Sequence, residues 1–85
     1  MITGNEMPHK IESLVSLVCS SDLAVQAIRW LNDSANGQEL LNNTGQQQLI
    51  LTTKVVRSTS YTCEMQVFLF NGFTVLQETT TVYST

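Results

Sequence analysis

The sequence predicts an α+β domain, with a helical hairpin first and an antiparallel sheet after it. Apolar residues recur at helical spacing in the first third of the chain, Thr and β-branched residues prevail beyond Gly45, and an Asn-Gly pair separates two apolar runs. The predicted helices span residues 8–19 and 22–34, and a three-stranded meander follows over 47–56, 61–70 and 73–83.

The length of the chain predicts one domain. Eighty-five residues support a single small core, so residues 1–85 are expected to fold as one unit. Residues 1–7 form a polar lead-in, which we expect to be mobile because chain termini stay loose unless they are tied down.

The helical hairpin is predicted from two apolar stripes. The first stripe begins after Pro8, a residue suited to the first turn of a helix. The second follows the capping residues Ser20, Ser21 and Asp22 and includes Trp30. In one continuous helix the two stripes would point about 160° apart, so two packed helices are favoured over one rod. One further helical turn is expected around Leu40 and Leu41.

The best-defined element is the hairpin at Asn71-Gly72. Asn and Gly suit a two-residue type I′ turn, which needs positive φ at both central positions. That turn predicts that Phe70 lies opposite Phe73, Phe68 opposite Val75, and Val67 opposite Leu76.

This register sorts the side chains onto two faces of the sheet. One face is apolar along its length and is assigned to the helices; it holds Tyr61, Cys63, Met65, Val67, Leu69, Leu76 and Val82. The other face is polar except at one end, where it carries Phe68, Phe70, Phe73 and Val75, called here the phenylalanine cluster. Two short helices cover one face only, so the cluster is the predicted partner-binding site. The alternative is that the first helix, the Leu40-Leu41 turn or a curled strand over 47–56 covers it.

These features favour a small non-enzymatic protein-interaction module, similar in kind to inhibitors and adaptors. It would self-associate as a homo-oligomer, or block a larger protein partner, through its sheet or an open edge strand. The alternative is a single-stranded nucleic-acid-binding protein that stacks bases on the sheet aromatics beside Lys54 and Arg57. The formal charge of −3 disfavours nucleic acid and anionic membranes as partners.

No catalytic, cofactor-binding or metal-binding site is predicted. The single histidine, His9, would lie about 15 Å from Cys19 along one helix, nothing local supports a pair with Cys63, and the seven carboxylates are scattered. Cys19 and Cys63 show no metal-ligand spacing and are expected to be buried thiols.

The expected compartment is the cytoplasm. No apolar run approaches the 20 or so residues that span a bilayer, and the first residues do not resemble a signal peptide. If a signal peptide had been removed before Met1, a Cys19–Cys63 disulfide would become plausible, and the glycosylation sequons at Asn32 and Asn42 would matter.

Overall fold

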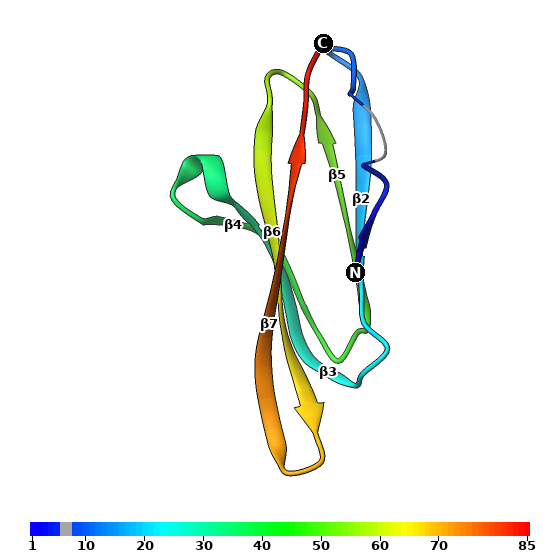
Figure 1. Cartoon of the computed structure of the whole chain (residues 1–85), viewed down its shortest axis with the longest axis vertical. Coiled ribbons are helices and arrows are strands. Elements are labelled where there is room, and N and C mark those ends of the chain that lie inside the picture. Colours follow the sequence, from blue (N-terminus) through cyan, green and yellow to red (C-terminus); the bar gives the residue numbers. More distant parts are fainter. Residues whose placement is uncertain (6–7) are drawn as a thin grey trace.

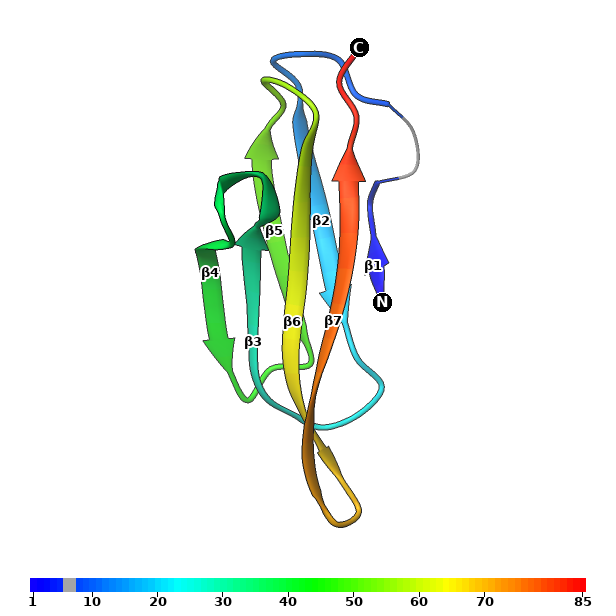
Figure 2. The same ribbon diagram turned by 60° about the vertical axis from the view of Figure 1, so that its left-hand side comes forward.

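The computed structural model describes residues 1–5 and 8–85, and their regular structure is almost entirely β. The elements are β1 (Ile2–Thr3), β2 (Leu14–Ser20), β3 (Val25–Asn32), the 3-10 helix η1 (Asp33–Ala35), β4 (Gln38–Thr44), β5 (Gln48–Lys54), β6 (Thr59–Leu69) and β7 (Gly72–Val82). Two antiparallel sheets, β1-β2-β5 and β4-β3-β6-β7, pack against each other as a sandwich (Figures 1 and 2). The predicted α+β class and helical hairpin are therefore wrong. No helix of the described residues is long and apolar enough to cross a membrane.

The first predicted helix, over 8–19, is replaced by strand β2. Val15, Leu17 and Cys19 are buried while Ser16 between them is exposed, which is the period of two expected of a half-buried strand. Valine, serine and cysteine are weak helix formers, and the spacing of the apolar residues here fits both periods. The residue propensities of this stretch favour a strand, whereas the spacing of its apolar residues does not distinguish a strand from a helix.

The second predicted helix, over 22–34, is strand β3. Its pairing with β6 shifts between Val25 and Ala27, and its pairing with β4 shifts between Trp30 and Leu31. The shift against β6 places the extra residue Gln26 in β3 and moves the inward-facing positions of that strand by one residue, whereas the shift against β4 places the extra residue Leu40 in β4. Val25 and Ile28 are consequently both buried in the core at a spacing of three. Leu31 is also buried, outside the core cluster and next to Trp30, so the buried positions of β3 imitate a helical stripe.

The predicted meander is also wrong. Strands do occupy the three C-terminal stretches, but β5 pairs with β2 in one sheet, whereas β6 pairs with β3 and β7 in the other. The stretch around Leu40 and Leu41 is the edge strand β4, with every residue exposed, and not a helical turn.

The β6–β7 hairpin forms, with a register two residues away from the predicted one. Leu69 pairs with Gly72 and Phe68 with Phe73, so Phe70 and Asn71 make the turn. Neither turn residue has positive φ; Gly72 does, at 141°, in a position where glycine often follows a type I turn. A slip of two residues leaves every side chain on its predicted face, because strand side chains alternate with a period of two. The apolar face packs against the other sheet, in place of the expected helices.

A disulfide between Cys19 and Cys63 joins the two sheets, so the predicted buried thiols are wrong. Trp30 pairs with Cys63 across β3 and β6, is fully buried, and donates from Nε1 to the Leu49 carbonyl at 3.0 Å. Tyr61 is buried two residues before Cys63. An inter-sheet disulfide beside a buried tryptophan, between sheets of this strand order, is the arrangement of an immunoglobulin-type β-sandwich.

The N-terminal residues pack against this sandwich. Ile2 and Thr3 pair with Cys19 and Val18, in a stretch predicted to be a mobile lead-in. The Asn5 amide donates to Thr80 Oγ1 and to the Thr81 carbonyl, both at 2.7 Å. The same prediction also included Glu6 and Met7, which lie outside the described residues. The C-terminal half of the β7 edge is therefore covered by the start of the chain.

Candidate interaction surface

Three connections gather at one end of the sandwich, called here the loop end: residues 21–24, residues 45–47 and the tip of the β6–β7 hairpin (Figure 2). Hydrogen bonds join them. Phe68 N donates to the Ala24 carbonyl at 2.8 Å, and Ser21 N donates to the Gln47 carbonyl at 2.9 Å. Gln47 Nε2 donates to the Leu23 carbonyl at 2.9 Å. The loop end is thus one hydrogen-bonded unit.

The hairpin extends beyond the rest of the molecule and carries the phenylalanine cluster outward (Figure 1). Phe70, in the turn, is 107% exposed, and the cross-strand pair Phe68 and Phe73 is 46% and 58% exposed. Val75 lies on the same face and is also about half exposed, at 48%. The structure therefore brings the predicted site residues together on the surface, and neither a helix nor the Leu40-Leu41 stretch covers them.

Sequence reasoning missed three further apolar residues at this end: Leu23, Leu69 and Leu76. Leu69 and Leu76 belong to the face that was assigned to the core, yet both are exposed. Leu69 lies beside the hairpin turn, and Leu76 lies on the edge strand β7. The sequence contained a signal of this exposure. The stretch from Val67 to Phe70 is apolar at every position, so it places apolar side chains on both faces of the strand.

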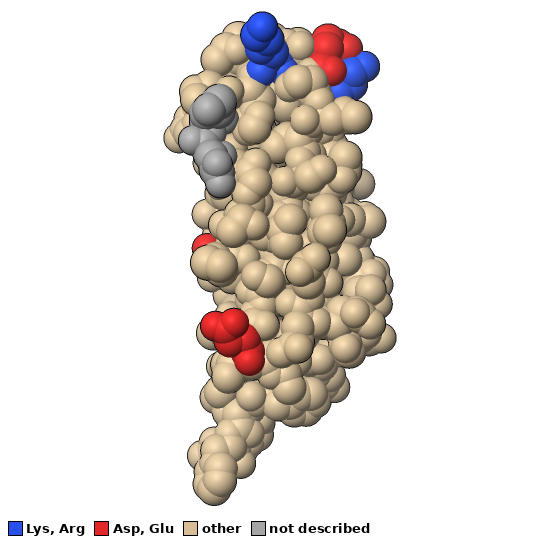
Figure 3. All heavy atoms as spheres, turned by 90° about the vertical axis from the view of Figure 1, so that its right-hand side faces the viewer, with Lys and Arg blue, Asp and Glu red and all other residues tan. Residues whose placement is uncertain are grey.

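The hairpin is uncharged, while the basic residues lie elsewhere. No Asp, Glu, Lys or Arg occurs between residues 65 and 77. Lys54 pairs with Glu12 at 2.7 Å, and Arg57 lies in the connection between β5 and β6, at the opposite end of the sandwich. The face drawn in Figure 3 shows its Lys and Arg side chains at that opposite end, away from the tapering hairpin. The aromatic residues and the basic residues therefore do not form a common surface.

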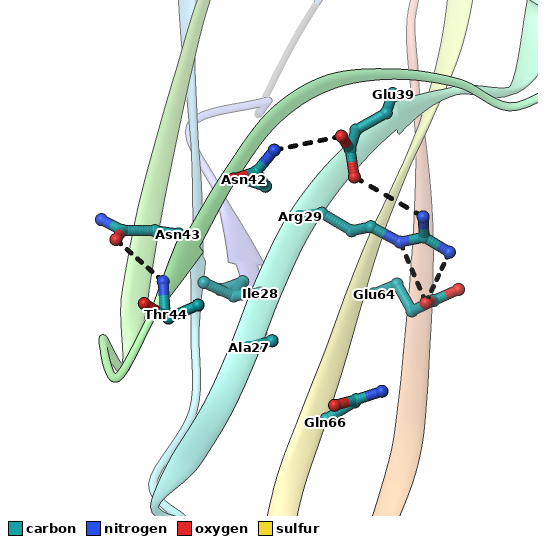
Figure 4. Close-up of a pocket in the computed structure, with 9 residues that line it drawn as sticks. All are labelled: Ala27, Ile28, Arg29, Glu39, Asn42, Asn43, Thr44, Glu64 and Gln66. Carbon is teal, nitrogen blue, oxygen red and sulfur yellow. Dashed lines mark hydrogen bonds and ion pairs between the residues drawn. The ribbon is translucent and has the colours of Figure 1, made fainter.

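A hollow of about 430 Å³ on the outer face of the four-stranded sheet contains a cluster of charged side chains (Figure 4). Arg29 Nη2 lies 2.8 Å from Glu64 Oε1, and Arg29 Nη1 lies 3.5 Å from Glu39 Oε1. Gln77 Nε2 donates to the other Glu64 oxygen at 2.7 Å. The hydrogen bond to Glu64, and then the charge of Glu64, raise the pKa of Arg29 above its ordinary value. This cluster links all four strands of the sheet, and its carboxylates are held by Arg29.

Other candidates for chemistry are occupied or dispersed. His9 Nε2 lies 3.2 Å from Asn5 Oδ1. The sulfurs of Cys19 and Cys63 form the disulfide. In residues 1–5 and 8–85, no group of three or more His, Cys, Asp or Glu side chains is placed to hold a metal ion. The apolar loop end is therefore the candidate functional surface.

Comparison with known proteins gives a match in structure and none in sequence. No protein-family model matches the chain. No curated protein matches it in sequence. The sulfur carrier protein SoxY from Chlorobium limicola f thiosulfatophilum has a similar structure, with a TM-score of 0.79 and 10% sequence identity; the match covers 100% of this chain and 77% of the SoxY chain. At this level of identity the likeness shows the fold alone.

Proposed function

We propose that this domain is a non-enzymatic protein-interaction module that binds a protein partner through its loop end. The observation that supports this most directly is the projecting hairpin with Phe70 at its tip and Phe68 and Phe73 behind it, all exposed. Aromatic side chains in contact with water cost free energy in the isolated domain, and they are the residues that protein interfaces use as anchors.

The construction of the loop end favours binding. Immunoglobulin-type sandwiches place binding loops at one end of the strands, where the scaffold holds them. Here the hydrogen bonds from Phe68 N to Ala24 and from Gln47 to Leu23 hold the hairpin against its neighbours. A surface that is already ordered loses less conformational entropy on binding, so the same contacts give a higher affinity.

Two other functions have less support. A nucleic-acid-binding surface needs cations near its aromatic residues, but Lys54 and Arg57 lie at the other end and Arg29 is paired with acids. Sulfur carriage, which belongs to SoxY by name, needs a sulfur atom that a partner can reach. Both cysteine sulfurs of this chain are buried in a disulfide, so we do not extend that role to it.

We also propose that the domain works in an oxidising compartment. The expected cytoplasmic location implied that both cysteines are free thiols, and the Cys19–Cys63 disulfide contradicts that implication. Disulfides persist in secreted and periplasmic proteins and are rare in the cytoplasm.

A comparison of three baits tests the binding proposal: wild type, Phe70→Ser and Val56→Ser. Val56 and Phe73 have the same exposed fraction, 58%, but Val56 lies at the opposite end, so its substitution controls for loss of apolar surface. Proteins recovered from extracts of the native host are quantified by mass spectrometry. We expect a partner that Val56→Ser retains and Phe70→Ser loses at least tenfold. Equal recovery by all three baits would contradict the proposal.

A further inference from the structure

The edge of strand β7 divides into a covered half and an open half. The covered half is held by Asn5, which bonds to Thr80 and Thr81, and by the backbone bond from His9 N to the Tyr83 carbonyl at 2.8 Å. The open half, residues 72–77, pairs with β6 on one side, and no strand of the described chain pairs with its other side. We call this stretch the free edge.

The free edge can form a regular set of hydrogen bonds. Gly72 pairs with Leu69 at the hairpin turn. From there along β7, residues whose N–H and C=O groups point toward β6 alternate with residues whose groups point away from it. The N–H and C=O groups of Phe73, Val75 and Gln77 therefore point away from β6. Natural edges of this kind are normally protected by a charged residue or a proline, and residues 72–77 contain neither.

The charge pattern of the free edge suits a second copy of the same segment. An antiparallel pairing centred on Val75 would place Phe73 of one copy opposite Gln77 of the other, with no charged residue in the paired stretch. The nearest charges on β7 are the two Glu78 residues. They would lie about 20 Å apart along the ladder, because six residues separate them at about 3.4 Å each. That distance exceeds the screening length of about 8 Å at physiological salt, so like-charge repulsion is weak.

We propose that two copies of the domain associate through their free edges, in an antiparallel β7–β7 pairing with a two-fold axis at Val75. The pairing joins two four-stranded sheets into one and covers Val75 and Phe73 on the outer face and Leu76 on the inner face. A closed two-fold contact of this kind ends at two copies, since each free edge is used once. This inference rests on the proposed binding role of the hairpin and adds a second copy as a partner at the β7 edge, with Phe70 in the turn outside the pairing.

Charge substitutions at the axis test this proposal. In sedimentation equilibrium we expect the wild type to dimerise, and Val75→Lys and Val75→Glu each to weaken dimerisation at least tenfold, because residue 75 faces itself across the axis. An equimolar mixture of the two variants should restore a one-to-one dimer. Val56→Lys, which changes an exposed valine far from the free edge, should dimerise like the wild type.

A cross-linking variant covers the case in which a charge at position 75 prevents folding. Val75→Cys should give a covalent dimer on mild oxidation, since paired residues of antiparallel strands lie about 5 Å apart. Gln66→Cys, which lies opposite Val75 on β6 and one strand away from the axis, should not. A wild type that stays monomeric at millimolar concentration, or a mixture of charge variants that stays monomeric, would overturn the pairing. If such a monomer still bound another protein through Phe70, the proposed function would stand and this inference alone would fail.

Discussion

The disulfide-bridged body and the projecting hairpin share the strands β6 and β7, yet these strands have different surroundings in the two regions. Cys63 and Val67 on β6 have no exposed surface, whereas Phe68 and Leu69, the next residues along, are nearly half exposed. The strands β6 and β7 have 11 residues each, and β2 and β5 of the facing sheet have seven. The additional length has no sheet to pack against. The body therefore supplies stability, and the hairpin supplies apolar surface that the body does not use.

The largest effect is expected in the body. The Cys19→Ala/Cys63→Ala double variant loses a cross-link that closes a 44-residue separation, which is worth about 4 kcal/mol by the loop-entropy relation. Since small domains have only about 5–15 kcal/mol in total, the variant should be unfolded or close to unfolding at 37 °C. Urea unfolding followed by Trp30 fluorescence measures this. An unchanged urea midpoint would mean that the sandwich does not depend on the bridge.

Two glycines offer a matched comparison between the regions. Gly4 has φ of +98°, and a Cβ there would overlap the Ser16 carbonyl oxygen on β2. Gly72 also has positive φ, but a Cβ there would meet open space. We expect Gly72→Ala to cost about 1 kcal/mol and Gly4→Ala at least about 1 kcal/mol more, because it also strains the packing of the backbone. Equal losses in thermal unfolding would show that Gly4 is not closely packed against β2.

A smaller effect is expected at the Arg29 cluster on the outer face. The side chains of Arg29 and Glu39 are partly exposed, so Arg29→Ala should cost less than about 1 kcal/mol. The pKa of Arg29 is raised, so its contribution is present throughout the physiological range and is lost only in strongly alkaline solution. Unfolding at low and high salt, between pH 6 and 9, would test this. A difference from wild type that changes across this pH range would contradict the assignment.

The sequence predicted the hairpin well because its signals are local. The Asn71-Gly72 pair located the turn to within one residue, and the alternation of Phe68 and Val75 with Val67 and Leu76 assigned the faces even though the register was two residues off. The exposure of the phenylalanine cluster followed from the faces, although the covering layer is a sheet and not the expected helices.

The first half of the chain was misread because the apolar spacing in β2 fits a helix and a strand alike, and because a bulge displaces the strand period of β3. Val25 and Ile28 lie three residues apart on the same buried face because Gln26 between them is the extra residue of a bulge, and that bulge depends on the pairing of β3 with β6. A longer-range signal was available. Cys19, Trp30 and Cys63, with Tyr61 two residues before the second cysteine, follow the order found in immunoglobulin domains, and reading them together favours a sandwich with a disulfide.

The most direct test of the separation between body and hairpin is a single substitution with two measurements. Phe73→Glu places a charge on the exposed hairpin face, beside Phe68 and outside the core. We predict an unfolding free energy within about 1 kcal/mol of wild type, because an exposed position contributes little to stability. In the same samples, association with the partner should fall at least tenfold. Unfolding of the variant would show that the cluster is part of the core, and unchanged association would show that it is not the binding surface.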